Sequence, residues 1–403
     1  MSTKAAIYLD ANAGSPLKLA AREALFDLLS DGDNQRLPRL LVSNSNPSSI
    51  HSHGRCAKRA FDRAKDQIAH SLGPSIDPDH LVFTSSGTEA NQWAVRSVLE
   101  AELKSGKKPH WITTSVEHDS NRNLLDWVRA QGGMVSELPV DSEGLVRLEG
   151  LDEIFSNQAS LLSAIWVNNE TGVITQLSDL SALARRYSIP IHVDAAQAWG
   201  KIPVDLASLQ AQYVSFSGHK IGGLAGTGVL WVSRDQAISP MILGKQEKGR
   251  RGGTENTLGV IALGAAAHGL DPVGWSSRVQ PLRDHLEREI SRRVPGTVVN
   301  GVGAGRVANT LNLNFEGVDR AGLVMALDLA GFSVSAGSAC SSGVSEPSHV
   351  LRAMGKTEGQ AKAAIRISLV DEMPGSEFEG FPENLVHALD RAVRRMRTTV
   401  GFD

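Results

Sequence analysis

The sequence is poor in cysteine and has no marked excess of charge of either sign. Its 403 residues include two cysteines, Cys56 and Cys340, which lie far apart. So few cysteines argue against a disulfide framework and against a thiolate zinc or iron–sulfur site, and they fit a reducing cytoplasm. The formal net charge of -3 leaves no basic excess. We therefore do not expect direct nucleic-acid binding.

Long apolar runs are also absent. No segment approaches the roughly 18 apolar residues that a membrane helix requires. No apolar stretch of a signal peptide follows Lys4 in MSTKAAIYLDANAG. The pair His51 and His53 lacks further ligands at metal-binding spacing. We therefore expect a protein of the cytoplasm that contacts no membrane and holds no metal.

Short runs rich in β-branched residues alternate with longer helical patterns through the first two thirds of the chain. The predicted strands are 80–84, 110–116, 160–167, 189–194, 211–217 and 227–233. The predicted helices include 54–73, in which Cys56 faces inward, and 88–105, 119–131 and 178–187. This alternation predicts an α/β fold with a mostly parallel, doubly wound sheet.

The last third of the chain has a different pattern. The segment GLDPVGWSS (269–277) breaks the alternation. Two long helical patterns follow around 278–294 and 380–398, with the strands VANTLNLNF and AAIRISLV between them. We expect a large domain over residues 19–275. Residues 1–18 and 276–403 are expected to form a smaller α+β domain.

Three polar groups follow predicted strands, where a doubly wound sheet binds its ligands. Gly87 and Thr88 come after HLVFT, Asp194 after IPIHV, and Lys220 within VSFSGHKIGGLAGTG. Each alone has an ordinary explanation, as a helix cap or a solvated loop charge. The glycines after Lys220 match neither a dinucleotide-binding nor a Walker motif.

Taken together, the three groups point to one cofactor. Pyridoxal 5′-phosphate (PLP) needs a lysine for its aldehyde, an acid beside its pyridinium nitrogen and a cradle for its phosphate. Lys220, Asp194 and the helix start at Gly87 and Thr88 supply these three groups. Their conjunction favours a PLP enzyme over three independent chance placements.

Eight motifs then narrow the family. In chain order they are NPSSIHSHGR, FTSSGTEAN, EHDSNRN, VNNETGV, HVDAAQAWGKIPVD, SFSGHKIGG, GRRGGTEN and GSACSSGVSEPSHVLRAMG. With these motifs the chain resembles the cysteine desulfurases of the NifS- and IscS-like branch, within the class V aminotransferase family of fold-type I PLP enzymes. The resemblance runs from YLDANAGSPL to AIRISL.

The resemblance implies roles for residues around the cofactor. Lys220 is expected to bind PLP covalently, and Asp194 to pair with the pyridinium nitrogen. His118 is expected to stack on the ring and to assist proton transfer. The other implied contacts are with the phenolic oxygen, through Asn169 and Gln197, and with the phosphate, through Gly87, Thr88, Ser217, His219 and, from the partner subunit of a homodimer, Thr254.

Residues for the substrate are implied as well. Arg366 matches the arginine that binds the substrate carboxylate, and Asn12 lies in the N-terminal motif on the substrate side. Alone, Cys340 could be a buried apolar residue, but its polar, glycine-bounded loop favours an accessible thiol. The resemblance implies that Cys340 takes the sulfur of L-cysteine. L-Alanine leaves, and a persulfide remains for an acceptor protein or a small thiol.

Several alternatives stay open. Ala11, Gly14 and Ser15 stand where the family usually has Asn, Thr and Thr, which leaves the preference for cysteine or selenocysteine undecided. A selenocysteine lyase or another class V aminotransferase would keep Lys220 and Asp194. A catalytically silent PLP-fold scaffold is a third hypothesis. No motif chooses among iron–sulfur clusters, tRNA thiolation and thio-cofactors as the destination of the sulfur.

Overall fold

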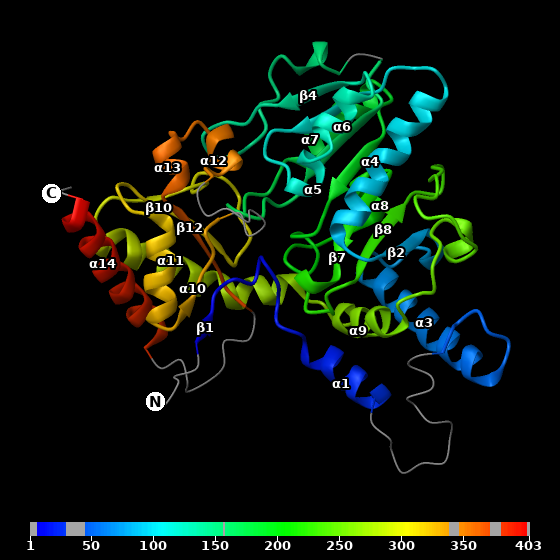
Figure 1. Cartoon of the computed structure of the whole chain (residues 1–403), viewed down its shortest axis with the longest axis horizontal. Helices are drawn as coiled ribbons and strands as arrows, with labels where there is room; N and C mark the ends of the chain where they lie inside the picture. Colours follow the sequence, from blue (N-terminus) through cyan, green and yellow to red (C-terminus); the bar gives the residue numbers. More distant parts are fainter. Residues whose placement is uncertain (1–5, 30–44, 156–157, 338–345, 371–379, 401–403) are drawn as a thin grey trace.

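The computed structural model describes residues 6–29, 45–155, 158–337, 346–370 and 380–400. Its larger part is built on a seven-stranded sheet in the order β2-β8-β7-β6-β5-β3-β4 (Figure 1). The strands are β2 (Leu81–Thr84), β3 (His110–Thr114), β4 (Met134–Leu138), β5 (Leu161–Ile165), β6 (Ile191–Asp194), β7 (Tyr213–Ser217) and β8 (Gly228–Val232). Among these strands only β8 runs opposite to the others, so its pairs with β2 and β7 are antiparallel and the remaining pairs are parallel. The predicted mostly parallel sheet is therefore confirmed.

Helices cover both faces of this sheet because the side chains of each strand alternate between the faces. One face packs on α4 (Gly87–Lys104) and α6 (Leu125–Ala130), and there Val82 and Trp93 belong to one apolar cluster. The other face packs on α3 (Ser52–Ser71), α7 (Leu177–Arg186) and α9 (Thr257–Ala267), with α1 (Leu19–Leu29) against α9. With both faces covered, the ends of the strands remain as the place for a ligand.

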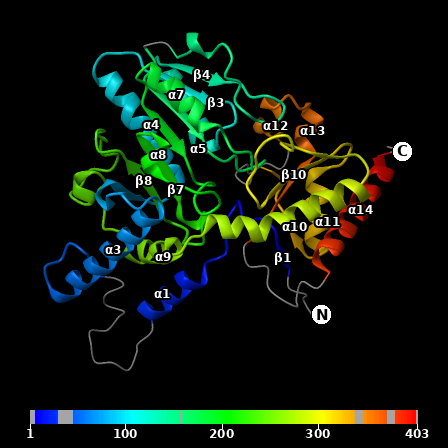
Figure 2. The same cartoon turned by 180° about the vertical axis from the view of Figure 1, so that it is seen from behind.

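A second apolar cluster surrounds a three-stranded antiparallel sheet in the order β12-β10-β9. Its strands are β9 (Thr297–Val299), β10 (Thr310–Phe315) and β12 (Ala364–Ser368), and its helices are α10 (Pro272–Arg293), α11 (Arg320–Leu329) and α14 (Phe381–Val400) (Figure 2). The N-terminal strand β1 (Ile7–Tyr8) pairs with β11 (Phe332–Ser333), so the N-terminal segment joins the last third of the chain. Short helices elsewhere are α5 (Asp119–Arg122), α8 (Leu206–Leu209), α12 (His349–Ala353) and α13 (Glu358–Lys362). The domain boundary at residue 275 stays a prediction.

The structure corrects the local expectations in three places. The helix expected over 119–131 is divided into α5 and α6. The break expected at 269–277 contains the start of α10, because the Asp271 side chain accepts a hydrogen bond from the Gly274 N–H at 2.9 Å and Pro272 opens the helix. Strand β4 was not expected, since it has only one fully buried residue and hence no apolar run.

The structure also bears on three expectations about chemistry, namely those for Cys56, for membrane helices and for metal sites. Cys56 is half-buried rather than turned to the core, and its Sγ lies 2.9 Å from a guanidinium nitrogen of Arg59. None of the described helices is long and apolar enough to cross a membrane. Within the same residues, no cluster of three or more histidine, cysteine or acidic side chains could hold a metal ion.

Candidate active site

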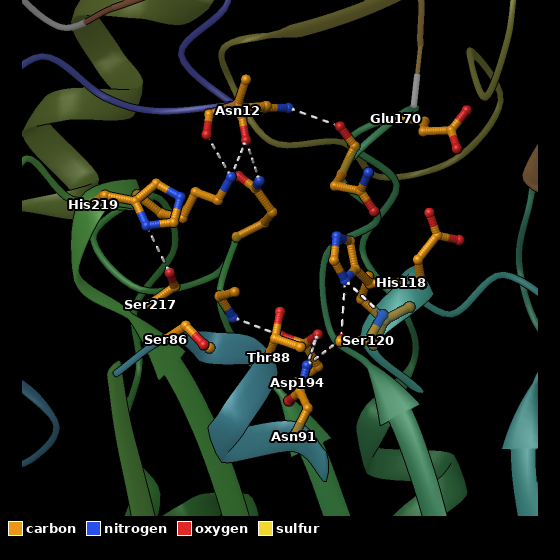
Figure 3. Close-up of a pocket in the computed structure, with 18 of the residues that line it drawn as sticks. Asn12, Ser86, Thr88, Asn91, His118, Ser120, Glu170, Asp194, Ser217 and His219 are labelled. Atoms are coloured by element: carbon orange, nitrogen blue, oxygen red, sulfur yellow. Dashed lines mark hydrogen bonds between the residues drawn. The ribbon is translucent and has the colours of Figure 1, made fainter. Parts of the chain in front are cut away.

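One pocket of about 290 Å³ lies at the carboxyl ends of the parallel strands, and β12 of the smaller sheet contributes to its lining. Strands β2, β3, β5, β6 and β7 run in one direction, so the residues that follow them meet at one edge. The lining includes, from the predicted site, Asn12, Gly87, Thr88, His118, Asn169, Asp194, Gln197, Ser217, His219, Lys220 and Arg366 (Figure 3). The structure thus brings most of the predicted residues together, while their roles stay predictions.

Asp194 ends β6 and is buried in the pocket. Its Oδ2 accepts a hydrogen bond from Asn91 Nδ2 at 2.6 Å, and its Oδ1 accepts one from the Ala196 N–H at 3.0 Å. Turns follow Asp194, so the alternative that it caps a helix is wrong. Sequence analysis missed Asn91, although it lies one helical turn after Gly87 and ends the motif FTSSGTEAN. Figure 3 shows Asp194 and Asn91 side by side.

The start of α4 offers backbone donors to the pocket. The Ser86 side chain accepts a hydrogen bond from the Glu89 N–H at 3.1 Å. The N–H groups of Gly87 and Thr88, at the first positions of the helix, have no intrahelical acceptor. A Cβ atom at Gly228 would lie 2.4 Å from the Ser86 carbonyl, so only glycine lets β8 approach the helix start. These donors and the positive end of the helix dipole suit an anion such as a phosphate.

Lys220 lies in a short 3₁₀ turn, η3 (Gly218–Lys220), directly after β7. Its Nζ donates to the carbonyl oxygens of Asn12 at 2.6 Å and Ala13 at 2.8 Å. Burial and the neighbouring charge of Lys220 lower the pKa of His219 to about 4, so this imidazole is neutral near pH 7. Ser217 Oγ lies 3.1 Å from His219 Nδ1. Lys220 is therefore a half-buried donor in the pocket, and the alternative of a solvated loop charge is wrong.

His118 and His219 lie on opposite sides of the pocket in Figure 3. His118 is the N-cap of α5, and its Nδ1 accepts a hydrogen bond from the Ser120 N–H at 3.1 Å. The same Nδ1 lies 2.9 Å from Ser120 Oγ. The capping hydrogen bond therefore fixes the Nδ1 edge of the His118 imidazole, while the side chain lines the pocket.

The residue before this histidine, Glu117, is a buried carboxyl group. Its oxygens accept hydrogen bonds from Thr114 Oγ1 at 2.6 Å, the Ile165 N–H at 2.7 Å and Asn121 Nδ2 at 2.9 Å. Burial raises the pKa of Glu117 to about 7 in spite of these donors. One carboxyl group thus ties the ends of β3 and β5 to α5.

Of two consecutive asparagines, the first forms a buried turn and the second lines the pocket. Asn168 is buried, and its Oδ1 accepts hydrogen bonds from the N–H groups of Glu170 and Thr171, both at 3.0 Å. Asn169 lines the pocket, and its carbonyl oxygen accepts from other elements. The turn that Asn168 forms is what presents Asn169 to the pocket.

Asn12 connects the N-terminal segment to the lysine and amide groups of the pocket. Its carbonyl oxygen accepts from Lys220 Nζ and, at 2.9 Å, from Gln197 Nε2. Its Oδ1 accepts from Lys201 Nζ at 2.7 Å, and its Nδ2 donates to the Asn169 carbonyl at 3.1 Å. The side chain is thus bonded to protein on both of its polar atoms. The expected contact of Asn12 with substrate stays a prediction.

Arg366 projects from β12 and is 1% exposed. Its Nη1 donates to the carbonyl oxygens of Asn169 at 2.9 Å and Gly337 at 3.0 Å, and its Nη2 pairs with Asp10 Oδ1 at 2.5 Å. Its Nε has no hydrogen-bond partner among the described residues. The guanidinium group therefore carries a counter-ion and keeps one donor unused within the described part of the chain.

Two predicted site residues are not placed in this pocket. Thr254 is exposed and is not part of the lining. Cys340 lies outside the described residues. The pocket therefore neither includes nor excludes the expected thiol, and Thr254 stays a prediction for a second subunit.

The pocket also contains residues that sequence analysis missed. His349 lines it and lies with its Nε2 2.9 Å from the Glu117 carbonyl oxygen. Glu170 is buried in the lining and accepts a hydrogen bond from Ser348 Oγ at 2.6 Å. Both residues lie inside recognised motifs, VNNETGV and SEPSHVLRAMG. Their place in these motifs was the sequence signal that could have identified them as pocket residues.

Comparison with known proteins agrees with this arrangement. The family model described as aminotransferase class-V matches residues 7–380. The chain belongs to the class V aminotransferase family. A cysteine desulfurase of Cereibacter sphaeroides is 37% identical over 387 residues, which is 96% of each chain. Among solved structures, a NifS-like protein has a TM-score of 0.84 and 28% identity, over 96% of this chain and 100% of that one.

A further solved structure, SspA in complex with cysteine, has a TM-score of 0.76 and 29% identity, over 90% of this chain and 98% of that one. With the NifS-like protein it confirms the predicted fold-type I architecture. The family implies PLP, and the pocket residues fit that group. Lys220, Asp194 and the free N–H groups at the start of α4 line one pocket, whose volume is close to the lower bound of about 300 Å³ for small-molecule sites.

Proposed function

We propose that the protein is a PLP-dependent cysteine desulfurase. It would act on L-cysteine, release L-alanine and pass the sulfur to an acceptor protein or a small thiol. The observation that carries this proposal is the shared pocket of Lys220, Asp194, the α4 start and Arg366. The names of the similar proteins support it, since one is a cysteine desulfurase and another structure contains cysteine.

The residues of the pocket divide the work on the amino acid. Lys220 would hold PLP and, once released, move the Cα proton of the substrate, with His118 assisting. Asp194, oriented by Asn91, would pair with the pyridinium nitrogen. PLP, when bound, draws electrons away from the Cα carbon of the amino acid. The helix start at Gly87 would hold the phosphate, together with Thr88, Ser217 and His219.

The substrate would be held at its carboxylate and attacked at its sulfur. Arg366 lines the pocket, and its guanidinium suits a carboxylate. Cys340, which lies outside the described residues, is the proposed nucleophile. Its thiolate would form an S–S bond with the substrate sulfur while the C–S bond breaks, and a persulfide would remain.

We also propose a homodimer in which Thr254 reaches the phosphate site of the partner. The exposure of Thr254 and its absence from the lining of its own pocket support this arrangement. A cytoplasmic location remains part of the proposal.

The experiment that tests the function combines cofactor mapping with product analysis. Wild-type protein incubated with PLP should be yellow, and borohydride reduction should attach the pyridoxyl group to the peptide that contains Lys220. Lys220→Ala should lose both the link and the activity, whereas Lys58→Ala, on the exposed face of α3, should keep them. With L-cysteine and a thiol reductant such as dithiothreitol, which reduces the persulfide, the wild type should release alanine and sulfide.

Two results would contradict the proposal. A pyridoxyl group on another lysine would refute the assignment of Lys220. A keto acid in place of alanine and sulfide would show transamination instead of desulfuration.

A further inference from the structure

Lys201 is a buried lysine with no role in the chemistry proposed above. It stands in the motif HVDAAQAWGKIPVD and is 6% exposed. Among the described residues it forms no ion pair with a carboxylate, and burial lowers its pKa well below the usual range, with the charges of Lys220 and Arg366 adding to the effect. A buried amino group without a counter-ion is unfavourable, so its contacts call for an explanation.

Both acceptors of Lys201 Nζ belong to residues at the cofactor lysine. One is Asn12 Oδ1, at 2.7 Å, and the other is Gln197 Oε1. The carbonyl oxygen of the same Asn12 accepts from Lys220 Nζ. Lys201 thus lies one residue removed from the pocket, behind both side chains.

These contacts determine how the Gln197 amide is turned. Lys201 Nζ donates to the amide oxygen, so Oε1 is held by a residue outside the lining of the pocket. Nε2 must then lie on the other side, where one N–H donates to the Asn12 carbonyl at 2.9 Å. The amide nitrogen Nε2 has a second N–H, and Gln197 lines the pocket. A group bound in the pocket beside Gln197 would therefore meet this N–H donor and not the amide oxygen.

We infer that Lys201 is a positioning residue that turns the Gln197 amide with its N–H groups toward the bound cofactor. The inference rests on the proposed function, because it assigns the donor to PLP. Lys201 acts through another side chain and does not itself contact the substrate.

The test is a double-mutant cycle of Lys201→Met and Gln197→Ala, read from the visible absorption of the PLP-loaded protein over pH. Lys201→Met keeps the length of the side chain and removes Nζ. It should shift the pH midpoint of the absorption change by about one unit, a tenfold change in proton affinity. In the Gln197→Ala background the same substitution should change that affinity less than about twofold, because residues that act through one contact are not additive.

Two further variants separate positioning from stability. Lys201→Arg should restore most of the wild-type spectrum, since it keeps the donors and a cavity of about 50 Å³ adjoins Lys201. Lys65→Met is the matched control. Lys65 is also buried, but it lies on α3 outside the pocket and pairs with Asp79 at 3.6 Å. Its removal should lower the melting temperature and leave the absorption midpoint unchanged.

The outcomes are distinguishable. A wild-type protein that takes up no PLP would overturn both the proposed function and this inference. Normal wild-type loading with an unchanged midpoint in Lys201→Met, or equal effects of Lys201→Met in both backgrounds, would overturn the inference alone. If Lys201→Met does not fold, the same cycle with Lys201→Gln, which removes the amino group and keeps a polar side chain, decides between these results.

Discussion

The floor and the wall of the pocket are built in different ways. The pocket floor consists of residues that end or follow strands of the large sheet, namely Gly87, His118, Asp194 and Ser217. The pocket wall consists of Asn12, Gln197 and Arg366, and Lys201 supports it from outside the lining.

Side-chain contacts in the floor include short-range pairs, such as His118 with Ser120, two residues apart. In the wall, Asn12 meets Lys201 across 189 positions, and Arg366 meets Asp10 across 356 positions. The floor is therefore set by where the strands of the large sheet end, whereas the wall also depends on the N-terminal segment and on the smaller sheet. We expect substitutions in the floor to affect the chemistry and those in the wall to affect positioning.

The largest effect is expected at the floor, for Asp194→Asn. The substitution keeps the shape and removes the charge that would pair with the pyridinium nitrogen. The rate of alanine and sulfide release should fall about 1,000-fold, the upper range for loss of one preorganised electrostatic group, while PLP uptake persists. Steady-state kinetics on the PLP-loaded protein measures this. Asp179→Asn on the exposed face of α7 serves as control, and a fall of less than threefold at Asp194 would contradict the assignment.

Beside the floor, outside the lining of the pocket, lies a carboxyl group whose ionisation should weaken the fold. The folded state raises the pKa of Glu117 from 4.5 to about 7. Its stabilising protonated form is fully present below pH 4.5 and is lost as pH rises through 7. At about 1.4 kcal/mol per pH unit, the free energy of unfolding should fall by about 2.5 kcal/mol between pH 5 and pH 8, and the fall ends near pH 7.

Glu117→Gln should remove that loss. The Asn121 amide can turn to accept from the new N–H group, because its Oδ1 has no partner among the described residues. Urea unfolding of the wild type and the variant at pH 5 and pH 8 measures the difference, with Glu23→Gln on α1 as an exposed control. Equal pH dependence in the wild type and Glu117→Gln would show that Glu117 does not titrate in this range.

The floor was largely predictable from the sequence, and the reason is geometric. Apolar runs mark the strands of a parallel sheet, and the residues after parallel strands meet at one edge. This rule alone placed Gly87, Asp194 and Lys220 together. It gave no reason to single out Asn91, since a polar residue one helical turn after a helix start reads as an ordinary surface position until the helix is packed on the sheet.

The wall was much less predictable. Arg366 and Asn12 were named only through the family resemblance, and their partners were not expected. Lys201 follows Gly200, and nothing in the local pattern indicates that its amino group is buried. Its burial follows from Asn12 and Gln197, which lie 189 and 4 positions away. Such contacts depend on tertiary packing, which periodicity does not describe.

The smallest effect is expected in the wall, for Arg366→Lys, and it separates substrate binding from structure. A lysine cannot reproduce the guanidinium fork, so KM for L-cysteine should rise about tenfold, the loss of one charge-assisted hydrogen bond. The effect is modest because Asp10 already neutralises Arg366. Cysteamine, which lacks the carboxylate, should be bound equally by wild type and variant, and PLP affinity should not change. Competition between cysteamine and L-cysteine measures the binding of both compounds to the wild type and the variant.

If cysteamine binding falls as much as L-cysteine binding, Arg366 acts through its bonds to Asn169 and Gly337. The wall would then stabilise the fold and would not bind the substrate carboxylate.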